Sequence, residues 1–270
     1  MTPLAKIVED FPRYRLAVLG DLMLDRYTWG RATRISQEAP VPVVLVEHEN
    51  CVPGGAANVA RNVLSLGAQA AAFGVVGADQ DGARLRQLLS DAGVDAARIL
   101  EERAVPTTVK TRVLAGSQQV VRIDREDPQT ITDAMRGEIL DRLSVLLKTQ
   151  RCSALIMEDY AKGLFTRQFM QSAVDLARRN GIFVALDPHP AHAFDLDGIR
   201  LMTPNRAEAF ALAGMPYERG IGDPVRDQPL MAVGRELLRR WRCELLLITL
   251  GAEGMALFTP QLSVPVHIPT

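Results

Sequence analysis

The sequence predicts an α/β fold with a doubly wound, mainly parallel sheet. Short apolar runs alternate with longer amphipathic stretches, which is the pattern of parallel strands joined by helical crossovers. Several amphipathic stretches are followed by a glycine, as at Gly67, Gly93 and Gly214, where a helix end favours a left-handed residue. The 270 residues are 47% hydrophobic and 23% charged, which suffices for one large globular domain.

Each element follows from its own pattern. Apolar runs predict the strands, 3.6-residue periodicity predicts the helices, and Thr132 and Thr166 are expected to cap two of them. The segment rich in Gly, Pro and Asp at 220–229 is predicted to be a loop. The predicted strands are 15–20, 71–76, 153–157, 182–186 and 245–250, and the predicted helices are 55–66, 80–92, 132–148, 166–180, 206–213 and 230–241.

Two stretches depart from this alternation. Residues 41–46 follow a proline-rich turn, and residues 107–124 read as two β runs joined by Ala115-Gly116-Ser117. We expect them to form a small β-flap, a lid made from about 26–50 and 106–124 within a single domain of residues 1–270. Lys110 and Arg112 should share one face of the flap, because side chains alternate along a strand.

Composition excludes several classes of protein. Lys plus Arg number 31 and Asp plus Glu number 32, so nothing attracts the chain generally to nucleic acid or to an anionic membrane, and neither is expected as a partner. Cys51, Cys152 and Cys243 are far apart, as is typical of reduced thiols. No apolar leader or membrane span is visible, which predicts a cytoplasmic protein.

Candidate site residues follow the first predicted strand and precede the first predicted helix. Asp21 and Asp25 lie where open α/β sheets bind ligands and could accept hydrogen bonds from a polyol, or they could be ordinary turn and surface aspartates. Gly54 and Gly55 would let a ligand approach the backbone, and Asn58 offers a donor and an acceptor, but such glycines can also serve packing alone. Neither a G-x-x-x-x-G-K-[ST] nor a G-x-G-x-x-G motif occurs.

The segment Gly-Gly-Ala-Ala-Asn-Val-Ala at 54–60, with glycines at 67 and 77, resembles the first motif of the ribokinase-like (PfkB) sugar kinases. Segments 20–27, 34–42, 118–124 and 159–163 further resemble, within that family, the D-glycero-β-D-manno-heptose 7-phosphate kinases of lipopolysaccharide-core precursor synthesis. The resemblance implies a kinase that uses ATP and Mg²⁺ to phosphorylate the anomeric hydroxyl of a heptose 7-phosphate. Some relatives carry a nucleotidyltransferase domain after the kinase.

The resemblance also implies roles for residues at the sugar end. The aspartates, glycines and asparagine named above would hold the sugar, and the flap would act as a lid that often pairs with a second subunit, so that a homodimer is expected. Lys110, Arg112 and Arg122 become candidates for the 7-phosphate, with Arg122 ranked first, or they are solvated strand charges. Asp159 and Lys162 fall at the same edge of the sheet.

At the nucleotide end, Asn205-Arg206-Ala207-Glu208 matches the family's N-x-x-E motif. Asn205 would meet nucleotide phosphates and Glu208 would help to organise Mg²⁺ through water. An asparagine followed three residues later by glutamate is also an ordinary helix start. The resemblance further places Thr249, Gly251 and Gly254 in a nucleotide loop.

Two departures from the family are expected to matter. The chain has Asp187-Pro-His189-Pro190 where relatives have Asp-Pro-Lys-Gly, which removes a cation for the nucleotide phosphates; His189 and His192 alone are not expected to bind a metal. The family's catalytic base ends a Gly-Ala-Gly-Asp motif that does not occur in this sequence and would follow Thr270. No residue is therefore predicted as the base, and the isolated polypeptide is expected to bind sugar phosphate with negligible turnover.

Two other interpretations stay open. One is a kinase of the same fold for an unphosphorylated sugar of the ribose or fructose type. The other is a non-catalytic homologue that binds sugar phosphate. The substitution Arg122→Ala should separate a phosphosugar site from a plain sugar site.

Overall fold

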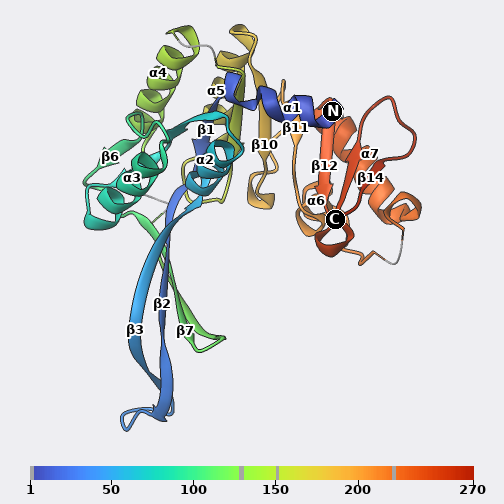
Figure 1. Ribbon diagram of the computed structural model, residues 1–270. Helices are drawn as coiled ribbons and strands as arrows, with labels where there is room; N and C mark the ends of the chain where they lie inside the picture. Colours follow the sequence, from blue (N-terminus) through green and yellow to red (C-terminus); the bar gives the residue numbers. More distant parts are fainter. Residues whose placement is uncertain (1–2, 128–130, 150–151, 221–222) are drawn as a thin grey trace.

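The computed structural model describes residues 3–127, 131–149, 152–220 and 223–270, and its centre is an eight-stranded sheet (Figure 1). The strands run parallel from the β4 edge to β12, and β13 and β14 continue the sheet antiparallel. The predicted mainly parallel sheet is confirmed. In spatial order the strands are β14 (Val266–Ile268), β13 (Met255–Phe258), β12 (Leu245–Thr249), β11 (Leu201–Met202), β10 (Phe183–Asp187), β9 (Ala154–Glu158), β1 (Arg15–Gly20) and β4 (Gln69–Phe73).

Helices cover both faces of the sheet because its strands are apolar on both sides. Within β1, Ala17 and Leu19 join one core cluster while Val18 joins the other. The first cluster packs against α4 (Asp133–Thr149), α5 (Arg167–Arg179), α6 (Arg206–Ala213) and α7 (Gln228–Trp241), and the second against α2 (Ala56–Ser65) and α3 (Gln80–Ala92). A further helix, α1 (Pro3–Asp10), precedes the sheet.

Helix starts follow the expected capping chemistry. Thr166 accepts a hydrogen bond from the Phe169 backbone N–H, and Thr132 accepts one from Met135, so both predicted caps are present. Helix α7 begins at Gln228, two residues before the predicted start at 230. Asp227 is its N-cap and accepts a hydrogen bond from the backbone N–H of Leu230. The loop predicted at 220–229 is shorter for that reason, and its residues 221–222 lie outside the described residues.

The strand predicted at 71–76 is divided in two. It breaks at Gly74, and β5 (Val75–Gly77) leaves the main sheet to pair with β6 (Leu100–Glu102). A Cβ at Gly74 would lie 2.5 Å from the carbonyl oxygen of Gly20, so the chain crosses the end of β1 at a distance that only glycine permits.

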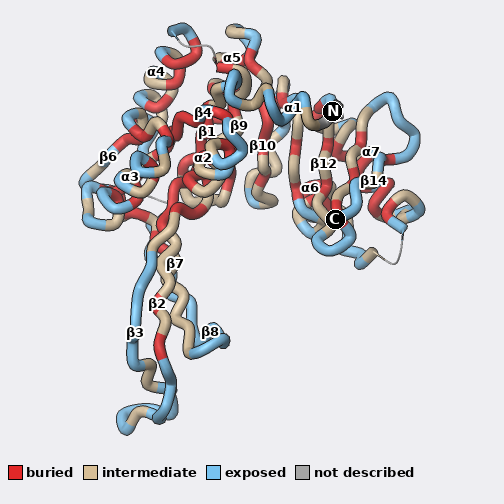
Figure 2. The backbone as a smooth tube through the Cα atoms, in the orientation of Figure 1, coloured by how far each residue is buried: buried red, intermediate tan, exposed pale blue. Residues whose placement is uncertain are grey.

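A four-stranded sheet, here called the flap, projects from the body (Figure 1). It consists of β3 (Pro42–Gly55), β2 (Leu22–Ile35), β7 (Thr108–Ala115) and β8 (Gln118–Arg125), in that order. The hairpin of β7 and β8 was predicted, whereas the long strand β2 was not. Most of the flap is exposed or half-buried beyond its attachment to the body (Figure 2).

Ion pairs fasten the base of the flap to the start of α3. Arg26 of β2 pairs with Asp81, and Arg125 of β8 lies 3.4 Å from Asp79 and 3.5 Å from Asp81. Asp79 also caps α3 and accepts a hydrogen bond from the Thr107 hydroxyl at 2.7 Å. These contacts connect the flap to α3 of the body.

The described part of the chain contains no helix that is both long enough and apolar enough to cross a membrane. Cys51, Cys152 and Cys243 are free thiols.

Candidate active site

Polar residues from distant parts of the sequence meet at one edge of the sheet, because parallel strands end at the same edge. Asp21 follows β1, Glu158 ends β9 and is followed by Asp159, and Asp187 ends β10. The segment from Thr203 to Asn205 follows β11, beside the end of β12. The flap rises from this edge next to β1.

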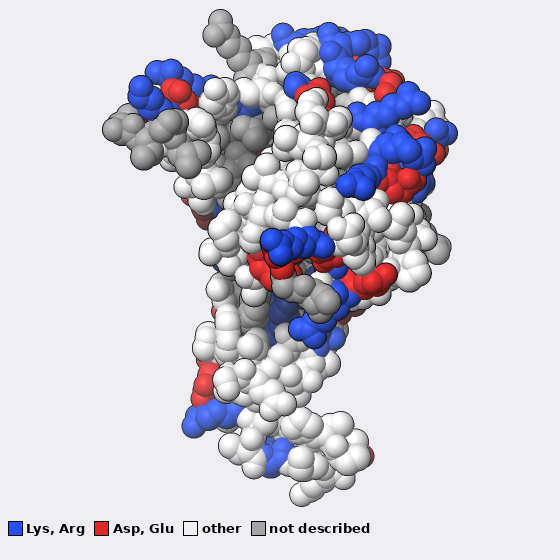
Figure 3. Space-filling model, turned by 90° about the vertical axis from the view of Figure 1, so that its right-hand side faces the viewer, with Lys and Arg blue, Asp and Glu red and all other residues white. Residues whose placement is uncertain are grey.

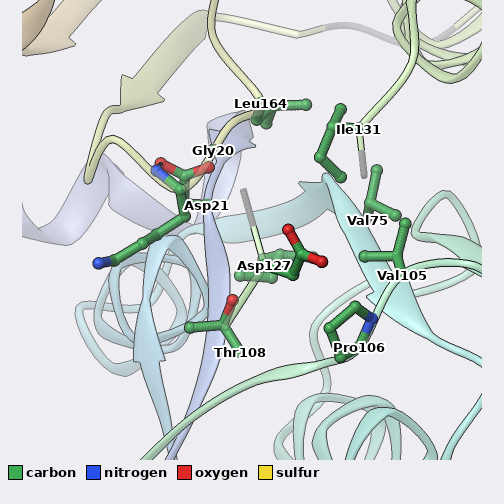
Figure 4. A pocket seen from close by; sticks show the side chains of 11 residues that line it. Gly20, Asp21, Val75, Val105, Pro106, Thr108, Asp127, Ile131 and Leu164 are labelled. Carbon is green, nitrogen blue, oxygen red and sulfur yellow. Dashed lines mark hydrogen bonds between the residues drawn. The ribbon is translucent and has the colours of Figure 1, made fainter. Parts of the chain in front are cut away.

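Asp21 lies in a pocket at the base of the flap (Figure 4). Its Oδ2 atom accepts hydrogen bonds from the backbone N–H groups of Tyr160 at 2.9 Å and Lys162 at 3.1 Å. Burial raises the pKa of Asp21, against the lowering effect of these hydrogen bonds. The wall facing Asp21 is apolar and includes Val75, Val105, Pro106 and Ile131, while Leu164 lines the pocket on the side of Asp21.

Two polar residues in this pocket were not predicted. Thr108, at the start of β7, and Asp127 both line it, and the carboxylate of Asp127 points toward its centre (Figure 4). Asp127 comes two residues after β8 of the predicted flap, and this position in the sequence could have marked it as a candidate site residue.

The glycines predicted to hold the sugar have a packing role. A Cβ at Gly54 would lie 2.6 Å from Oδ2 of Asp25, and one at Gly55 would lie 2.6 Å from the carbonyl oxygen of Asp21. Gly55 also has a φ of +54°, which favours glycine. Asn58 lies on the first turn of α2, where its Oδ1 accepts a hydrogen bond from Arg61 at 2.9 Å.

Three of the four cations predicted near the sugar are already paired with carboxylates. This leaves each of them less available to a second anion, since its charge is partly neutralised. The pairs are Arg112 with Asp25 at 2.7 Å, Arg122 with Asp124 through two hydrogen bonds of 2.9 and 3.0 Å, and Lys162 with Glu126 at 2.8 Å.

Lys110 differs from the other three. It forms no ion pair with any of the described residues, and its Nζ lies 5.8 Å from the ring centroid of Tyr160, in the loop that also binds Asp21. Burial, and next the charge of Lys162, lower the pKa of Lys110. Asp25 and Asp124, which lie opposite Lys110 on the neighbouring strands, act in the other direction and favour its charge. Lys110 is thus a half-buried cation at the base of the flap, beside the loop that binds Asp21.

A pair of carboxyl groups, one buried and one half-buried, lies between the sugar end and the nucleotide end, and the sequence did not predict their pairing. Glu158 and Asp187 are opposite each other in the register of β9 and β10. Burial and then Asp187 raise the pKa of Glu158 to about 8, and burial raises that of Asp187 to about 6. The Thr203 hydroxyl donates to Asp187 at 3.0 Å. The sequence signal that could have indicated this pair is a glutamate at the end of an apolar strand.

Asp159 and His192 form a second unpredicted pair. The Asp159 side chain is completely buried, and its Oδ2 lies 2.8 Å from Nδ1 of His192. Its Oδ1 accepts a hydrogen bond from the backbone of Ala161 at 2.9 Å. The imidazole stacks on Phe194 with ring centroids 5.2 Å apart.

The predicted nucleotide residues at the start of α6 form a capping box. Asn205 Oδ1 accepts from the backbone N–H of Glu208 at 3.0 Å, and Glu208 Oε2 accepts from that of Asn205 at 2.8 Å. The ordinary helix-start role is therefore present, and it leaves these groups at the edge of the sheet. Ala207 is exposed on the same turn.

The guanidinium of Arg206 contacts the segment before α7 and not the other predicted nucleotide residues. Its Nη2 lies 2.8 Å from Asp227 Oδ2 in an ion pair without hydrogen-bond geometry, and its Nε donates to the Glu218 carbonyl. The guanidinium also covers the ring of Phe210. Its observed contacts tie α6 to the segment before α7.

The loop after β12 carries the remaining predicted nucleotide residues. Thr249 bridges to Asn205 in parallel register, which places the two beside each other. Gly251 has a φ of +64° and open space around its Cα. At Gly254, a Cβ would lie 2.1 Å from the carbonyl oxygen of Ile268, so this glycine serves the packing of β14.

Comparisons with known proteins agree with this arrangement. The profile described as "pfkB family carbohydrate kinase" matches residues 14–270. The chain is 41% identical over 253 residues to the "Bifunctional protein HldE" of Geobacter sulfurreducens and 37% identical over 269 residues to that of Caulobacter vibrioides. These matches cover 94% and 98% of this chain but 50% and 53% of the relatives, so the chain spans about half their length.

Solved structures share the fold at low sequence identity. Escherichia coli phosphofructokinase-2 in its tetrameric inhibited form superimposes with a TM-score of 0.70 at 19% identity, covering 95% of this chain and 79% of that one. Arabidopsis thaliana ribokinase complexed with ribose and ATP gives 0.65 at 17% identity, covering 95% and 78%. The chain has the ribokinase-like fold and belongs to the pfkB family of carbohydrate kinases, which are phosphotransferases.

Proposed function

We propose that this chain binds a heptose 7-phosphate and ATP and serves the transfer of the γ-phosphoryl group to the anomeric hydroxyl, which gives the 1,7-bisphosphate. The observation that carries the choice of a phosphosugar is Lys110, a half-buried cation without an ion-pair partner among the described residues. An unphosphorylated sugar carries no charge that could pair with the Lys110 ammonium group. A phosphate dianion could form such a charge-assisted hydrogen bond and would stabilise the half-buried cation. The HldE relatives and the motifs shared with heptose kinases support the same choice.

At the sugar end, Asp21 and Asn58 hold hydroxyl groups in this proposal. Asp21 is fixed by backbone N–H groups, so its carboxylate is oriented before the sugar arrives. Asp25 acts indirectly, because it pairs with Arg112 and positions that guanidinium on the ring of Tyr27. Lys110 takes first place for the 7-phosphate, and Arg122, which Asp124 already neutralises, becomes secondary.

At the nucleotide end, ATP would lie along the loop after β12 and the start of α6. Mg²⁺ fits the donors there: Glu208 is one of the charges that raise the pKa of Asp187, so negative charge is in excess between β10 and α6. Glu208 would hold the ion through water. When bound, Mg²⁺ would neutralise charge on the transferring phosphates. The described residues contain no cluster of three or more His, Cys, Asp or Glu that could hold a metal without the nucleotide.

No residue is proposed as the base, because the Gly-Ala-Gly-Asp motif is not part of this sequence. What the described residues supply is the binding and orientation of both substrates, which accounts for most of the catalysis of phosphoryl transfer.

Binding tests the proposal directly. Calorimetric titration should show heptose 7-phosphate binding at least about tenfold more tightly than the dephosphorylated heptose, since a charge-assisted hydrogen bond contributes about 1.5–3 kcal/mol. Equal affinity for the two sugars would favour the plain-sugar kinase. A folded sample that binds neither sugar would overturn the proposal.

We also propose that two copies associate through the flap. Ile35 and Leu45 are 62% and 65% exposed, and Val121 and Ile123 on β8 are also exposed. Lys and Arg gather on the body away from the flap, whose surface in the same view is mainly uncharged (Figure 3). Sedimentation should give a dimer that Leu45→Asp converts to a monomer; a monomeric unchanged protein at micromolar concentration would contradict this.

A further inference from the structure

The pair formed by Asp159 and His192 has no role in the function proposed above. His192 ends the short helix η3 (Pro190–His192), and its side chain is 19% exposed. Asp159 on one side and the ring of Phe194 on one face fix the imidazole. Because a carboxylate only accepts, Nδ1 is the donor in this pair, and Nε2 is the polar atom left for a ligand.

The pair lies between the proposed sugar end and the proposed nucleotide end of the site. The sugar end is at β1 and the nucleotide end is at β11 and β12, and the ends of β9 and β10 lie between them. Three strand spacings separate β1 from β11, which is about 14 Å at about 4.8 Å each. The helix η3 follows β10 and contacts α6, so His192 lies over this gap.

This part of the edge carries much negative charge and little positive charge. Glu158 and Asp187 end the two strands, and Asp159 directly follows the first of them. In the described segments 159–166 and 188–194, which follow β9 and β10, the basic side chains are Lys162, which pairs with Glu126, and two histidines. Arg136 of α4 also reaches the first segment, where it donates to the carbonyl oxygens of Gly163 and Leu164.

The two histidines differ in what their δ nitrogens do. Nδ1 of His189 accepts a hydrogen bond from the backbone N–H of Ala191 at 3.2 Å, so this ring must be neutral to keep its contact. Nδ1 of His192 donates to Asp159, so this ring keeps its contact when Nε2 is protonated as well. Only His192 can therefore present a positively charged donor without breaking a hydrogen bond.

We propose that His192, oriented by the buried carboxylate of Asp159, donates from Nε2 to the phosphates of the bound nucleotide. It supplies a cation beside the Asp187-Pro-His189-Pro190 segment, where the resemblance described above implies a lysine in relatives. The inference rests on the proposed binding of ATP. Asp159 is then a positioning residue, reassigned from the sugar end.

The test compares the full chain with His192→Gln, which removes the cation but keeps an amide able to donate to Asp159. The matched control is His189→Asn, which keeps an acceptor for Ala191. Affinities for ATP with Mg²⁺ and for adenosine are measured by calorimetry or by competition. We expect His192→Gln to weaken ATP about tenfold or more and to leave adenosine unchanged, while His189→Asn changes neither.

A second variant distinguishes loss of the cation from disruption of the fold. Adding His189→Lys to His192→Gln places a lysine at the position where the resemblance implies one, and it should restore much of the ATP affinity. Equal losses for ATP and adenosine, or an ATP affinity unchanged by His192→Gln, would overturn the role of His192 while the unchanged protein still binds ATP. A folded protein that binds no ATP at all would overturn both this inference and the proposed function.

Discussion

Replacing Glu158 by glutamine removes a carboxyl group whose charge the fold disfavours. The pKa of Glu158 is raised from 4.5 to about 8, first by burial and then by Asp187. Between these pH values the folded protein holds a proton that the unfolded chain has lost, so stability falls as the pH rises. This contribution is fully present below pH 4.5 and is lost above about pH 8.

The size of the effect follows from the same two values. At about 1.4 kcal/mol per pH unit, the interval from 4.5 to about 8 corresponds to at most about 5 kcal/mol. Glutamine cannot ionise, and its amide can still donate to Asp187 across the two strands. The variant should therefore match the unchanged protein at pH 5 and exceed its stability by several kcal/mol at pH 8.5.

Urea unfolding between pH 5 and pH 8.5 measures this difference. Glu38→Gln, which alters an exposed glutamate on the flap, is the control and should run parallel to the unchanged protein. Parallel profiles for Glu158→Gln and the unchanged protein would refute the reasoning, since they would mean that Glu158 titrates alike in the folded and unfolded states.

Three further predictions concern single residues. Lys110→Met should weaken heptose 7-phosphate about tenfold or more without changing the affinity for the dephosphorylated sugar, as calorimetry can show. Gly20→Ala would place a Cβ 2.4 Å from the Glu158 carbonyl oxygen and should lower stability by about 2 kcal/mol or more, whereas Gly137→Ala in open space on α4 should raise it by about 0.5–1 kcal/mol in thermal unfolding. Arg206→Met leaves Asp227 buried and unpaired, so it should cost about 3–5 kcal/mol in urea unfolding with ATP affinity retained in the folded fraction; a selective loss of ATP binding would assign Arg206 to the nucleotide after all.

Local signals predicted most of the body. Periodicity and caps such as Thr166 are properties of a few consecutive residues, and they located the six predicted helices to within about two residues, whereas α1 was not predicted. Strand β2 was missed because its outer half is polar and exposed and is held by pairing with β3 and β7, which the sequence of β2 does not reveal. Strand formation there depends on long-range ladders.

For the candidate site too, the sequence predicted the features that depend on local position and missed those that depend on long-range contacts. The rule that ligands bind at strand ends located Asp21 and Asp159 without any knowledge of contacts. The sequence could not predict which charged groups pair. Arg112 pairs with Asp25, which is 87 positions away in the sequence, and Glu158 is brought beside Asp187 only by the register of β9 and β10. The ranking of Lys110 over the arginines and the pairing of His192 depend on such contacts.

One oxygen atom connects the two ends of the site. Oδ2 of Asp21 binds the backbone of the loop at 160–162, and that loop directly follows Asp159, which orients His192. A sugar that engages Asp21 would stiffen this loop before the nucleotide arrives. Linkage then requires reciprocity: ATP must raise the affinity for the sugar by the same factor by which the sugar raises the affinity for ATP.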